Sequence, residues 1–405
     1  MNEPSSTDPL DQPLRTRTPA LFRRNHRRRS SRRRGHSQLR SPRELVTIFS
    51  AFIWLKRLFI MAGLFIGAAL VWLGLCLEID TEHNLFLTTL SYLPIWLPLL
   101  PVLFVLPILL FFSRLHASIL ALGAACYFFM HVLTHYGSGQ ATPTAPLTAL
   151  NNFRVMSFNV GQSHHVDFVR LLEEMKPDII LLQEARGWLK RKDLSPELVP
   201  FAFREEKGEF AILSKHPLQE SGPPVVSMTV NGREKTCAYR HRMLVFGRRV
   251  TVFNVHMPSP RDLLKWNAGG ACMLGLIHWT SPGISDLHQQ RTLPWRDRAY
   301  ALGQIASLVE HEPNLVVVGG DLNCPPWGGG YRALCRSLKD CFAEAGHGFG
   351  TTFPGDFAWL PDFISPWVRL DHLLVSKDAH VQEWRQMRSG QMQHLPVCAE
   401  IHPQG

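Results

Sequence analysis

The sequence has little excess charge outside its first 50 residues. Residues 1–50 hold twelve arginines, no lysine and four acidic residues, which is +8 of the +10 carried by the whole chain and leaves +2 for the other 355 residues. A domain that binds nucleic acid through its overall charge is expected to be basic throughout. The near-neutral remainder therefore gives no charge-based argument for a polyanionic substrate.

Paired cysteines and internal repeats are also lacking. Two of the eight cysteines fall inside apolar segments, and the other six form no C-x-x-C motif: Cys237, Cys272, Cys324, Cys335, Cys341 and Cys398. This spacing does not favour a zinc site built on thiolates. Disulfides would form only in an oxidising compartment, and the sequence does not choose among their pairings. No repeat of 20 to 50 residues is visible.

The N-terminal third predicts a membrane anchor. Residues 1–50 are expected to form a disordered, Arg-rich cytoplasmic tail that attracts anionic lipid and fixes topology, with a nucleic-acid-binding arm as the alternative. Within residues 51–135, three apolar stretches each approach the roughly 20 residues that a membrane-crossing helix needs. They predict three transmembrane helices, at 58–77, 86–112 and 115–133. The second is expected to be kinked, because it contains Pro94, Pro98, Pro101 and Pro107.

The charges between these stretches predict their orientation. The Arg-rich tail precedes the first stretch, acidic residues precede the second, and Arg114 precedes the third. Basic residues inside and three crossings would place everything after residue 134 outside the cytoplasm. The predicted protein is thus a multi-pass membrane protein with an extracytoplasmic, or periplasmic, C-terminal domain. A linker over residues 136–152, rich in glycine and proline, would join the two parts.

From residue 153 to residue 405, short apolar runs alternate with helical segments, which predicts one α/β domain. Helices are expected at 167–175 and 298–309. Strands are expected at 154–158, 178–182, 210–213, 237–246, 250–255, 315–318, 370–375 and 397–401. The segment 261–297 contains three tryptophans and interrupts this pattern. It is predicted to be an insertion that shapes a substrate mouth or contacts lipid, with a packed surface loop as the alternative.

Polar side chains lie at the ends of several predicted strands. They are Asn159, Glu184, His256, Asp321, Asn323, Asp371 and His394. Taken singly, each has an ordinary alternative as a solvated strand end or a turn former. Taken together, they lie where a rigid buried sheet meets solvent, which is typical of active sites in α/β folds. The sequence therefore predicts an active site at this edge.

The order and local context of these residues resemble the endonuclease/exonuclease/phosphatase family, which includes deoxyribonuclease-I-like nucleases. The resemblance covers nearly all of residues 153–402 and implies a four-layer α/β sandwich, in which two packed mixed β-sheets are flanked by helices. Here three transmembrane helices would precede it. The matching runs are RVMSFNV (154–160), DIILLQEA (178–185), FAILSKHPL (210–218), VTVFNVHMPSP (250–260), VVVGGDLNCPP (316–326), RLDHLLVS (369–376) and HLPVCAEI (394–401).

This resemblance implies a metal site. Glu184 would be the main ligand, with Asn159 beside it, and such oxygen ligands suit Mg²⁺ or Mn²⁺. One position departs from the family pattern, because Gln393 precedes the last histidine where an acid is usual. Gln393 can still coordinate through its carbonyl oxygen, but it removes a negative charge from the site.

The resemblance also implies catalytic roles for five residues. Asp321 would activate or orient the attacking water, and Asn323 would bind a phosphate oxygen. His394, hydrogen-bonded to Asp371, would form an acid/base pair, because a carboxylate fixes the imidazole tautomer and supports its protonated form. His256 would be a second donor, to the phosphate or to the leaving group, with a histidine satisfied within a turn as the alternative.

These features predict a membrane-anchored, metal-dependent hydrolase in which water attacks a metal-polarised phosphate monoester or diester. Its partners would be the lipid bilayer and a phosphate-ester substrate, and no protein partner can be inferred. The substrate stays open between a lipid-linked phosphate, favoured by the predicted spans, and nucleic acid, which would make the protein a true nuclease. The competing class is a binding or scaffold protein that lost turnover through the Gln393 change.

Overall fold

The computed structural model describes residues 42–79, 81–139, 152–161, 166–190, 198–355 and 365–403. The chain divides into two compact units, Met1–Ile53 and Trp54–Gly405. In the first unit the described residues, 42–53, are helical and begin α1 (Pro42–Ile79). Residues 1–41 of the predicted tail and residues 140–151 of the predicted linker lie outside the described residues.

Two helical segments near the N-terminus are long and apolar enough to cross a membrane, Val46–Ile79 and Arg114–His135. The second consists of α4 (Arg114–Tyr127), a π-helical turn η2 (Phe128–Val132) and a 3-10 turn η3 (Leu133–His135). The prediction of three spans is therefore wrong. The predicted extracytoplasmic position of the C-terminal domain was derived from three crossings, so two candidate spans no longer support it.

The middle apolar stretch is broken where its prolines stand. It forms α2 (Leu85–Leu90), a 3-10 turn η1 (Leu97–Leu99) and α3 (Leu100–Phe112). Proline lacks an N–H and disfavours helical geometry at the residue before it, so Pro94 and Pro98 end any continuous helix from residue 86. The remaining apolar helix, Leu97–Phe112, is about 24 Å long at 1.5 Å per residue. That is shorter than the roughly 30 Å of a hydrocarbon core.

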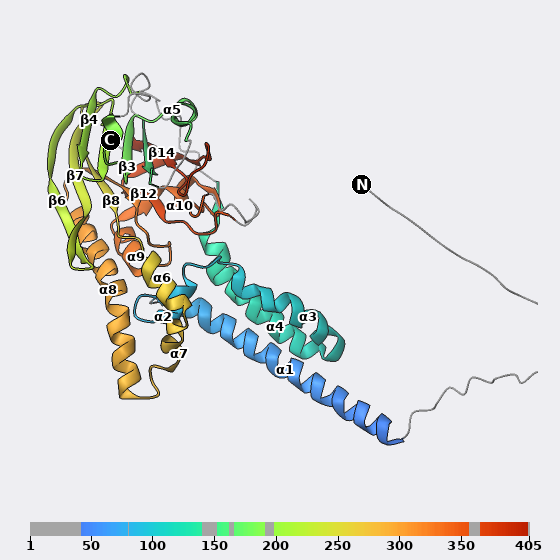
Figure 1. Cartoon of the computed structure of the whole chain (residues 1–405). Helices are drawn as coiled ribbons and strands as arrows, with labels where there is room; N and C mark the ends of the chain where they lie inside the picture. Colours follow the sequence, from blue (N-terminus) through green and yellow to red (C-terminus); the bar gives the residue numbers. More distant parts are fainter. Residues whose placement is uncertain are drawn as a thin grey trace, which may run out of the picture. The chain divides into compact units, whose positions relative to one another are not determined.

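The C-terminal part contains two six-stranded mixed sheets (Figure 1). The first sheet has the order β13-β14-β2-β3-β5-β4 and the second β10-β12-β9-β8-β7-β6. Strands of the first are β2 (Phe153–Asn159), β3 (Ile179–Gln183), β4 (Phe203–Lys207), β5 (Phe210–Ser214), β13 (Ala379–Gln386) and β14 (Val397–Pro403). Strands of the second are β6 (Leu218–Val230), β7 (Arg233–Val245), β8 (Arg248–His256), β9 (Leu315–Asp321), β10 (Leu338–Asp340) and β12 (Asp371–Ser376). A short pair, β1 (Gly137–Ser138) and β11 (His347–Gly348), lies apart from both.

The two sheets pack face to face through side chains that alternate along their strands. Val155 and Leu181 of the first sheet share one buried cluster with Val252, Val317 and Leu373 of the second. Side chains at every second position of a strand point to the same face, so each of these strands presents one face to this cluster and the other to helices. The predicted packing of two mixed sheets is thus confirmed.

Helices cover the outer face of each sheet. On the first sheet α5 (Phe168–Met175) buries Leu171 against Phe158. On the second, α8 (Pro282–Glu310) and α9 (Gly329–Cys335) bury Leu302 and Leu334 against Phe253. Figure 1 shows α8 running beside β6 and α9. All eight cysteines, which lie among the described residues, are free thiols, so no disulfide stabilises this architecture.

The segment 261–297 is helical and packs against the N-terminal region. It forms α6 (Arg261–Ala268), η7 (Ala271–Met273), α7 (Leu274–Ile277) and the first half of α8. The Asn84 amide donates to the Gly275 carbonyl at 2.8 Å, and the Asn267 amide donates to the Thr89 hydroxyl at 3.0 Å. The insertion is therefore joined to α2 and the residues around it.

Candidate active site

Strand pairing brings the predicted polar residues to one edge of the sandwich. In the first sheet β2 and β3 are parallel, so Asn159 and Glu184 leave the sheet at neighbouring positions. In the second, β8 and β9 are parallel and place His256 beside Asp321, while antiparallel β12 places Asp371 on the other side of Asp321. The carboxyl ends of the two parallel pairs therefore hold these side chains together.

Asp321 lies at the centre of this group and is buried. Its Oδ2 accepts hydrogen bonds from the amides of Asn323 (2.8 Å) and Asn159 (3.0 Å), and its Oδ1 accepts one from the Asn323 backbone N–H (2.9 Å). The same Oδ2 lies 3.7 Å from His394 Nε2 and 3.8 Å from His256 Nε2. One carboxylate oxygen thus faces two amides and two imidazoles.

Two glycines before Asp321 set its position. A Cβ on Gly319 would lie 2.6 Å from Leu181 of the facing sheet, and a Cβ on Gly320 would lie 1.8 Å from the Val255 carbonyl oxygen. Gly320 also has a φ of +152°, which side chains rarely adopt. Glycine at both positions therefore lets the end of β9 approach its neighbours closely.

Glu184 lies on the open side of the group, with 38% of its side chain exposed and a backbone φ of +54°. Asn159 connects it to Asp321, because the Asn159 amide also donates to Glu184 Oε1 at 3.3 Å. The side-chain oxygen Oδ1 of Asn159 accepts a hydrogen bond from the Gly161 backbone N–H at 2.9 Å. A Cβ at Gly161 would stand 1.9 Å from Glu184 Oε2, so the carboxylate occupies space that only glycine leaves free.

His394 forms the predicted pair with Asp371, at 2.9 Å between Nδ1 and Oδ2. Burial opposes protonation of this imidazole, but the negative charges of Asp371 and Asp321 outweigh it and raise the pKa of His394 to about 9. The Thr352 hydroxyl oxygen accepts the backbone N–H of Asp371 at 3.1 Å and helps to fix that residue. His394 is thus held as a cation at neutral pH.

His256 and Asn323 complete the buried part of the site. His256 Nδ1 pairs with Glu209 Oε1 at 2.8 Å, which orients Nε2 toward Asp321 and toward Glu184, 3.7 Å away. The Asn323 amide also donates to the Met257 carbonyl at 2.9 Å. The partner of His256 is thus a partly exposed carboxylate from another strand connection, and its Nε2 lies within 4 Å of both Asp321 and Glu184.

The group opens into a cavity of about 580 Å³. Predicted residues in its wall are Glu184, Asp321, Asn323, Gln393 and His394. Residues that the sequence did not indicate also line it, among them Tyr92, Arg261, Lys265, Phe353 and Leu370. Arg261 and Lys265 lie one turn apart on α6 and bring positive charge to a cavity whose acidic side chains are Glu184, Asp262 and Asp321. Asp262 lies 3.9 Å from Lys265 and offsets part of that charge. Part of the predicted insertion therefore does reach the cavity mouth.

The donor set fits a hard divalent cation. Asp321, Asp371 and His394 offer ligand atoms within 4.8 Å of one another. Within the described part of the chain Asp371 Oδ1 is buried and has no hydrogen-bond partner, although such an oxygen normally has one. Glu184, the ligand expected to matter most, lies outside this trio and is connected to it through Asn159. The carboxylate and amide oxygens suit Mg²⁺ or Mn²⁺, whereas a protonated His394 would lie beside the cation as a hydrogen-bond donor and not as a ligand.

Two structural partners were missed by the sequence interpretation. Glu209 stands before β5 in a tight β4–β5 connection, and nothing in its local pattern separates it from a solvated turn residue. Tyr92 lies far away in the chain, where the apolar pattern predicts a membrane helix. Its hydroxyl donates to the Asn323 carbonyl at 2.8 Å, and its ring lies 5.7 Å from that of buried Trp295.

Comparisons with known proteins found one matching family and a set of similar solved structures. The model of the Endonuclease/Exonuclease/phosphatase family matches residues 156–390. Similar solved structures include a protein of that family from Leptotrichia buccalis (14% identity, TM-score 0.43, covering 62% of this chain and 99% of that one). Others are a truncated Caenorhabditis elegans TDP2 (18%, 0.40, 62% and 97%) and a Bacteroides thetaiotaomicron mannosyl-6-phosphatase (18%, 0.41, 62% and 99%). No curated protein sequence is significantly similar to this chain.

Proposed function

Because the chain belongs to the endonuclease/exonuclease/phosphatase family, we propose that it is a divalent-metal-dependent hydrolase of phosphate esters. The observation that carries this proposal is the surrounding of Asp321. Its carboxylate meets two imidazoles and two amides at the floor of an open cavity, and each of these groups has a separate partner that fixes it. Such a preorganised set of charges and donors is what an in-line attack on phosphate requires.

Glu184, Asn159 and Gln393 would hold the cation, together with the unpaired oxygen of Asp371. Bound there, Mg²⁺ or Mn²⁺ would polarise a phosphoryl oxygen and offset the charge that develops on it. The exposure of Glu184 to the cavity supports this assignment, since a ligand oxygen must reach both metal and substrate. Gln393 contributes no charge, so the site would bind its cation more weakly than one with a further carboxylate.

Asp321 would accept a proton from the attacking water while the water oxygen forms a bond to phosphorus. The bond from phosphorus to the leaving oxygen breaks in the same step, and that oxygen needs a proton. His394 is protonated at neutral pH and can stabilise the negative phosphate oxygens, while His256, oriented by Glu209, can donate the proton. Asn323 would hold a phosphate oxygen beside Asp321.

We further propose that the two long apolar helices anchor the protein in a membrane. Only 28% of the most apolar stretch of Val46–Ile79 and 33% of that of Arg114–His135 are buried. A core helix of a soluble protein would be mostly buried, whereas these helices expose large apolar side chains such as Trp54, Phe65 and Leu122. Without a membrane this surface would be an extended apolar patch in water.

The substrate class that fits best is a lipid-linked phosphate. Tyr92, from the segment between the apolar helices, forms part of the cavity wall, so the cavity is built next to the proposed anchor. Arg261 and Lys265 could bind a second anionic group of the substrate, such as the other phosphate of a pyrophosphate. Nucleic acid is the alternative substrate, for which the near-neutral charge of the domain provides no support.

The test uses the full chain in detergent micelles with three substrates: bis-p-nitrophenyl phosphate, a polyprenyl pyrophosphate and plasmid DNA. Each is assayed with Mg²⁺, Mn²⁺ or chelator. We expect metal-dependent turnover, fastest on the lipid, and a loss of 100-fold or more in Glu184→Gln and Asp321→Asn. Glu173→Gln, an exposed acid on α5, is the matched control. Absence of turnover on every substrate, or wild-type activity in Glu184→Gln, would favour the binding or scaffold class.

A further inference from the structure

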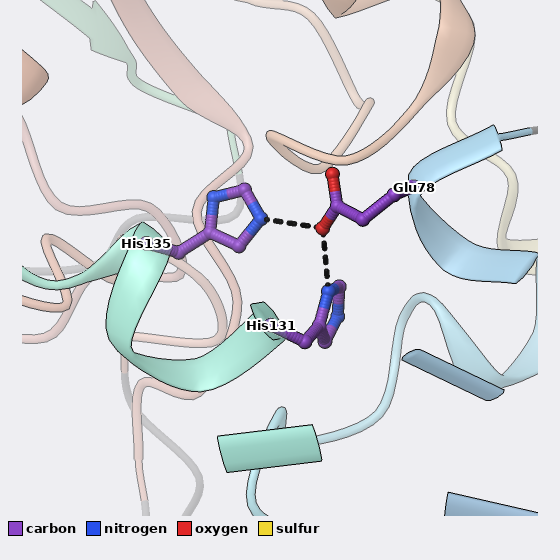
Figure 2. Close-up of side chains that lie close together, drawn as sticks. All are labelled: Glu78, His131 and His135. Carbon is purple, nitrogen blue, oxygen red and sulfur yellow. Dashed lines mark hydrogen bonds and ion pairs between the residues drawn. The ribbon is translucent and has the colours of Figure 1, made fainter. Parts of the chain in front are cut away.

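A second group of metal-ligand side chains lies outside the active site, at the ends of the two long apolar helices. Glu78 stands near the end of α1, and His131 and His135 stand near the end of the Arg114–His135 segment. Figure 2 shows the three side chains pointing toward one another, with one carboxylate oxygen shared by both imidazoles. Glu78 Oε1 lies 2.8 Å from His131 Nδ1 and 3.4 Å from His135 Nε2.

These separations are close to those in a tetrahedral metal site. Ligand atoms about 2.0 to 2.2 Å from zinc, at tetrahedral angles, lie roughly 3.3 to 3.6 Å from one another. The three ligand atoms here all lie within 4.8 Å of one another. Glu78 Oε1 and His135 Nε2 already have such a separation, whereas Glu78 Oε1 and His131 Nδ1 would have to move apart by about half an ångström. The side chains therefore need little movement to hold one cation.

Local helix geometry brings both histidines to this place. The chain changes from α-helix to a π-helical turn over Phe128–Val132 and then to a 3-10 turn over Leu133–His135. Single π-turns inside helices are uncommon and are frequent at functional sites. The end of α1 is also fixed, because Arg332 of α9 donates from Nη2 to the Ile79 carbonyl at 3.0 Å. The three ligands thus come from anchored elements.

The exposure of the three side chains leaves one face open. His131 is 1% exposed, His135 18% and Glu78 37%. A cation bound by three protein ligands on this arrangement could take water from the open side as its fourth ligand. The simpler alternative is a hydrogen-bonded Glu-His-His cluster, in which the carboxylate accepts from both imidazoles. The 3.4 Å separation to His135 is long for that bond.

We propose that Glu78, His131 and His135 form a second metal site, which binds a transition-metal dication such as Zn²⁺. Two imidazoles and one carboxylate suit Zn²⁺, whereas Mg²⁺ and Mn²⁺ prefer oxygen ligands. The site would have a structural role. The Trp327 ring lies 5.1 Å from both imidazole rings, and Trp327 is four residues beyond Asn323 in the same loop. The cation would hold the ends of the apolar helices against the loop that leaves the active site.

The test measures zinc bound to the purified full chain in detergent, after equilibration with Zn²⁺ in the presence of excess Mg²⁺ and removal of free metal. We expect His131→Ala and His135→Ala each to lose one equivalent of Zn²⁺ relative to wild type. His116→Ala, a histidine of α4 outside the cluster, should keep it. Asp321→Asn should also keep it, which separates this site from the active site and from any failure of the proposed hydrolase function.

A measurement on the wild-type protein keeps the proposal falsifiable if a variant does not fold. X-ray absorption at the zinc edge should show two imidazole ligands and additional oxygen ligands. A wild-type chain that binds no zinc under these conditions, or whose zinc has a coordination without two imidazoles, would overturn the proposal. Equal zinc content in folded wild type, His131→Ala and His135→Ala would overturn it as well.

Discussion

The substitution Gly161→Ala should inactivate the enzyme by moving one carboxylate. The added methyl group would stand 1.9 Å from Glu184 Oε2, whereas ordinary contacts begin near 3.4 Å, so the carboxylate must retreat by about 1.5 Å. Misplacement of a catalytic group by about 1 Å can cost roughly 100-fold in rate. We therefore expect about a 100-fold fall in kcat at saturating Mg²⁺ and a higher half-saturating Mg²⁺ concentration, measured with bis-p-nitrophenyl phosphate.

The protein should remain folded, because the methyl group meets the end of a partly exposed side chain. The shift of the thermal unfolding midpoint should correspond to a loss of no more than about 1 kcal/mol in the free energy of unfolding. Gly222→Ala is the matched control, since a Cβ there meets nothing within 4 Å. A Gly161→Ala enzyme with wild-type kcat and wild-type Mg²⁺ dependence would refute the assignment of Glu184 to the metal.

Three further predictions concern charge. In metal-free protein the His394 imidazole should titrate near pH 9 by NMR. In Asp371→Asn the pKa of His394 should be lower, because burial then meets less opposing negative charge. In the wild type the raised pKa of His394 stabilises the folded state fully below about pH 6.5, and this stabilisation is lost as pH rises through 9. The thermal unfolding midpoint of Asp371→Asn should therefore not show this loss between about pH 6.5 and 9. Arg369→Met should cost about 3 to 5 kcal/mol in unfolding free energy, because it leaves buried Asp340 without its 2.5 Å partner. Gln393→Glu should lower the half-saturating Mg²⁺ concentration roughly tenfold in the activity assay, since it adds a charge beside the cation; an unchanged value would place Gln393 away from the metal.

The sandwich could be predicted because its strands carry strong local signals. The expected strand at 178–182 corresponds to β3, and that at 250–255 to β8, with ends within a few residues. In β3 every residue but Gln183 is apolar, and in β8 the buried run from Val250 to Val255 is apolar except for Thr251 and Asn254, since both faces of these strands are buried. In contrast β6 carries Pro223 and Pro224 and many polar residues, so its 13 residues gave no strand pattern. Its pairing with β7 determines its structure.

Most of the predicted polar residues were found because they follow an apolar run along the chain, whereas Asp371 and His394 stand at or before the start of one. That signal depends on local order, and it places Asn159, Glu184 and Asp321 at strand ends whatever lies around them. The groups that position them give no such signal. Glu209 orients His256 although the two residues are 47 positions apart in the sequence. They come together only because the two sheets pack against each other, which places the start of β5 near the end of β8. Hydrogen-bond partners of this kind depend on tertiary structure.

The segment between the apolar helices shows how tertiary packing can override an apolar pattern. Its apolar residues suggested a membrane helix, but its backbone carbonyls accept hydrogen bonds from side chains near the active site. The Ser91 carbonyl accepts from Trp327 at 3.0 Å, the Tyr92 carbonyl accepts from Trp367 at 3.1 Å, and the Tyr92 hydroxyl donates to the Asn323 carbonyl. Asn323 has a φ of +45°, a conformation that needs support from its surroundings. The N-terminal region therefore helps to hold the residue proposed to bind phosphate, which explains why Trp54–Gly405 forms one compact unit although its sequence changes character near residue 153.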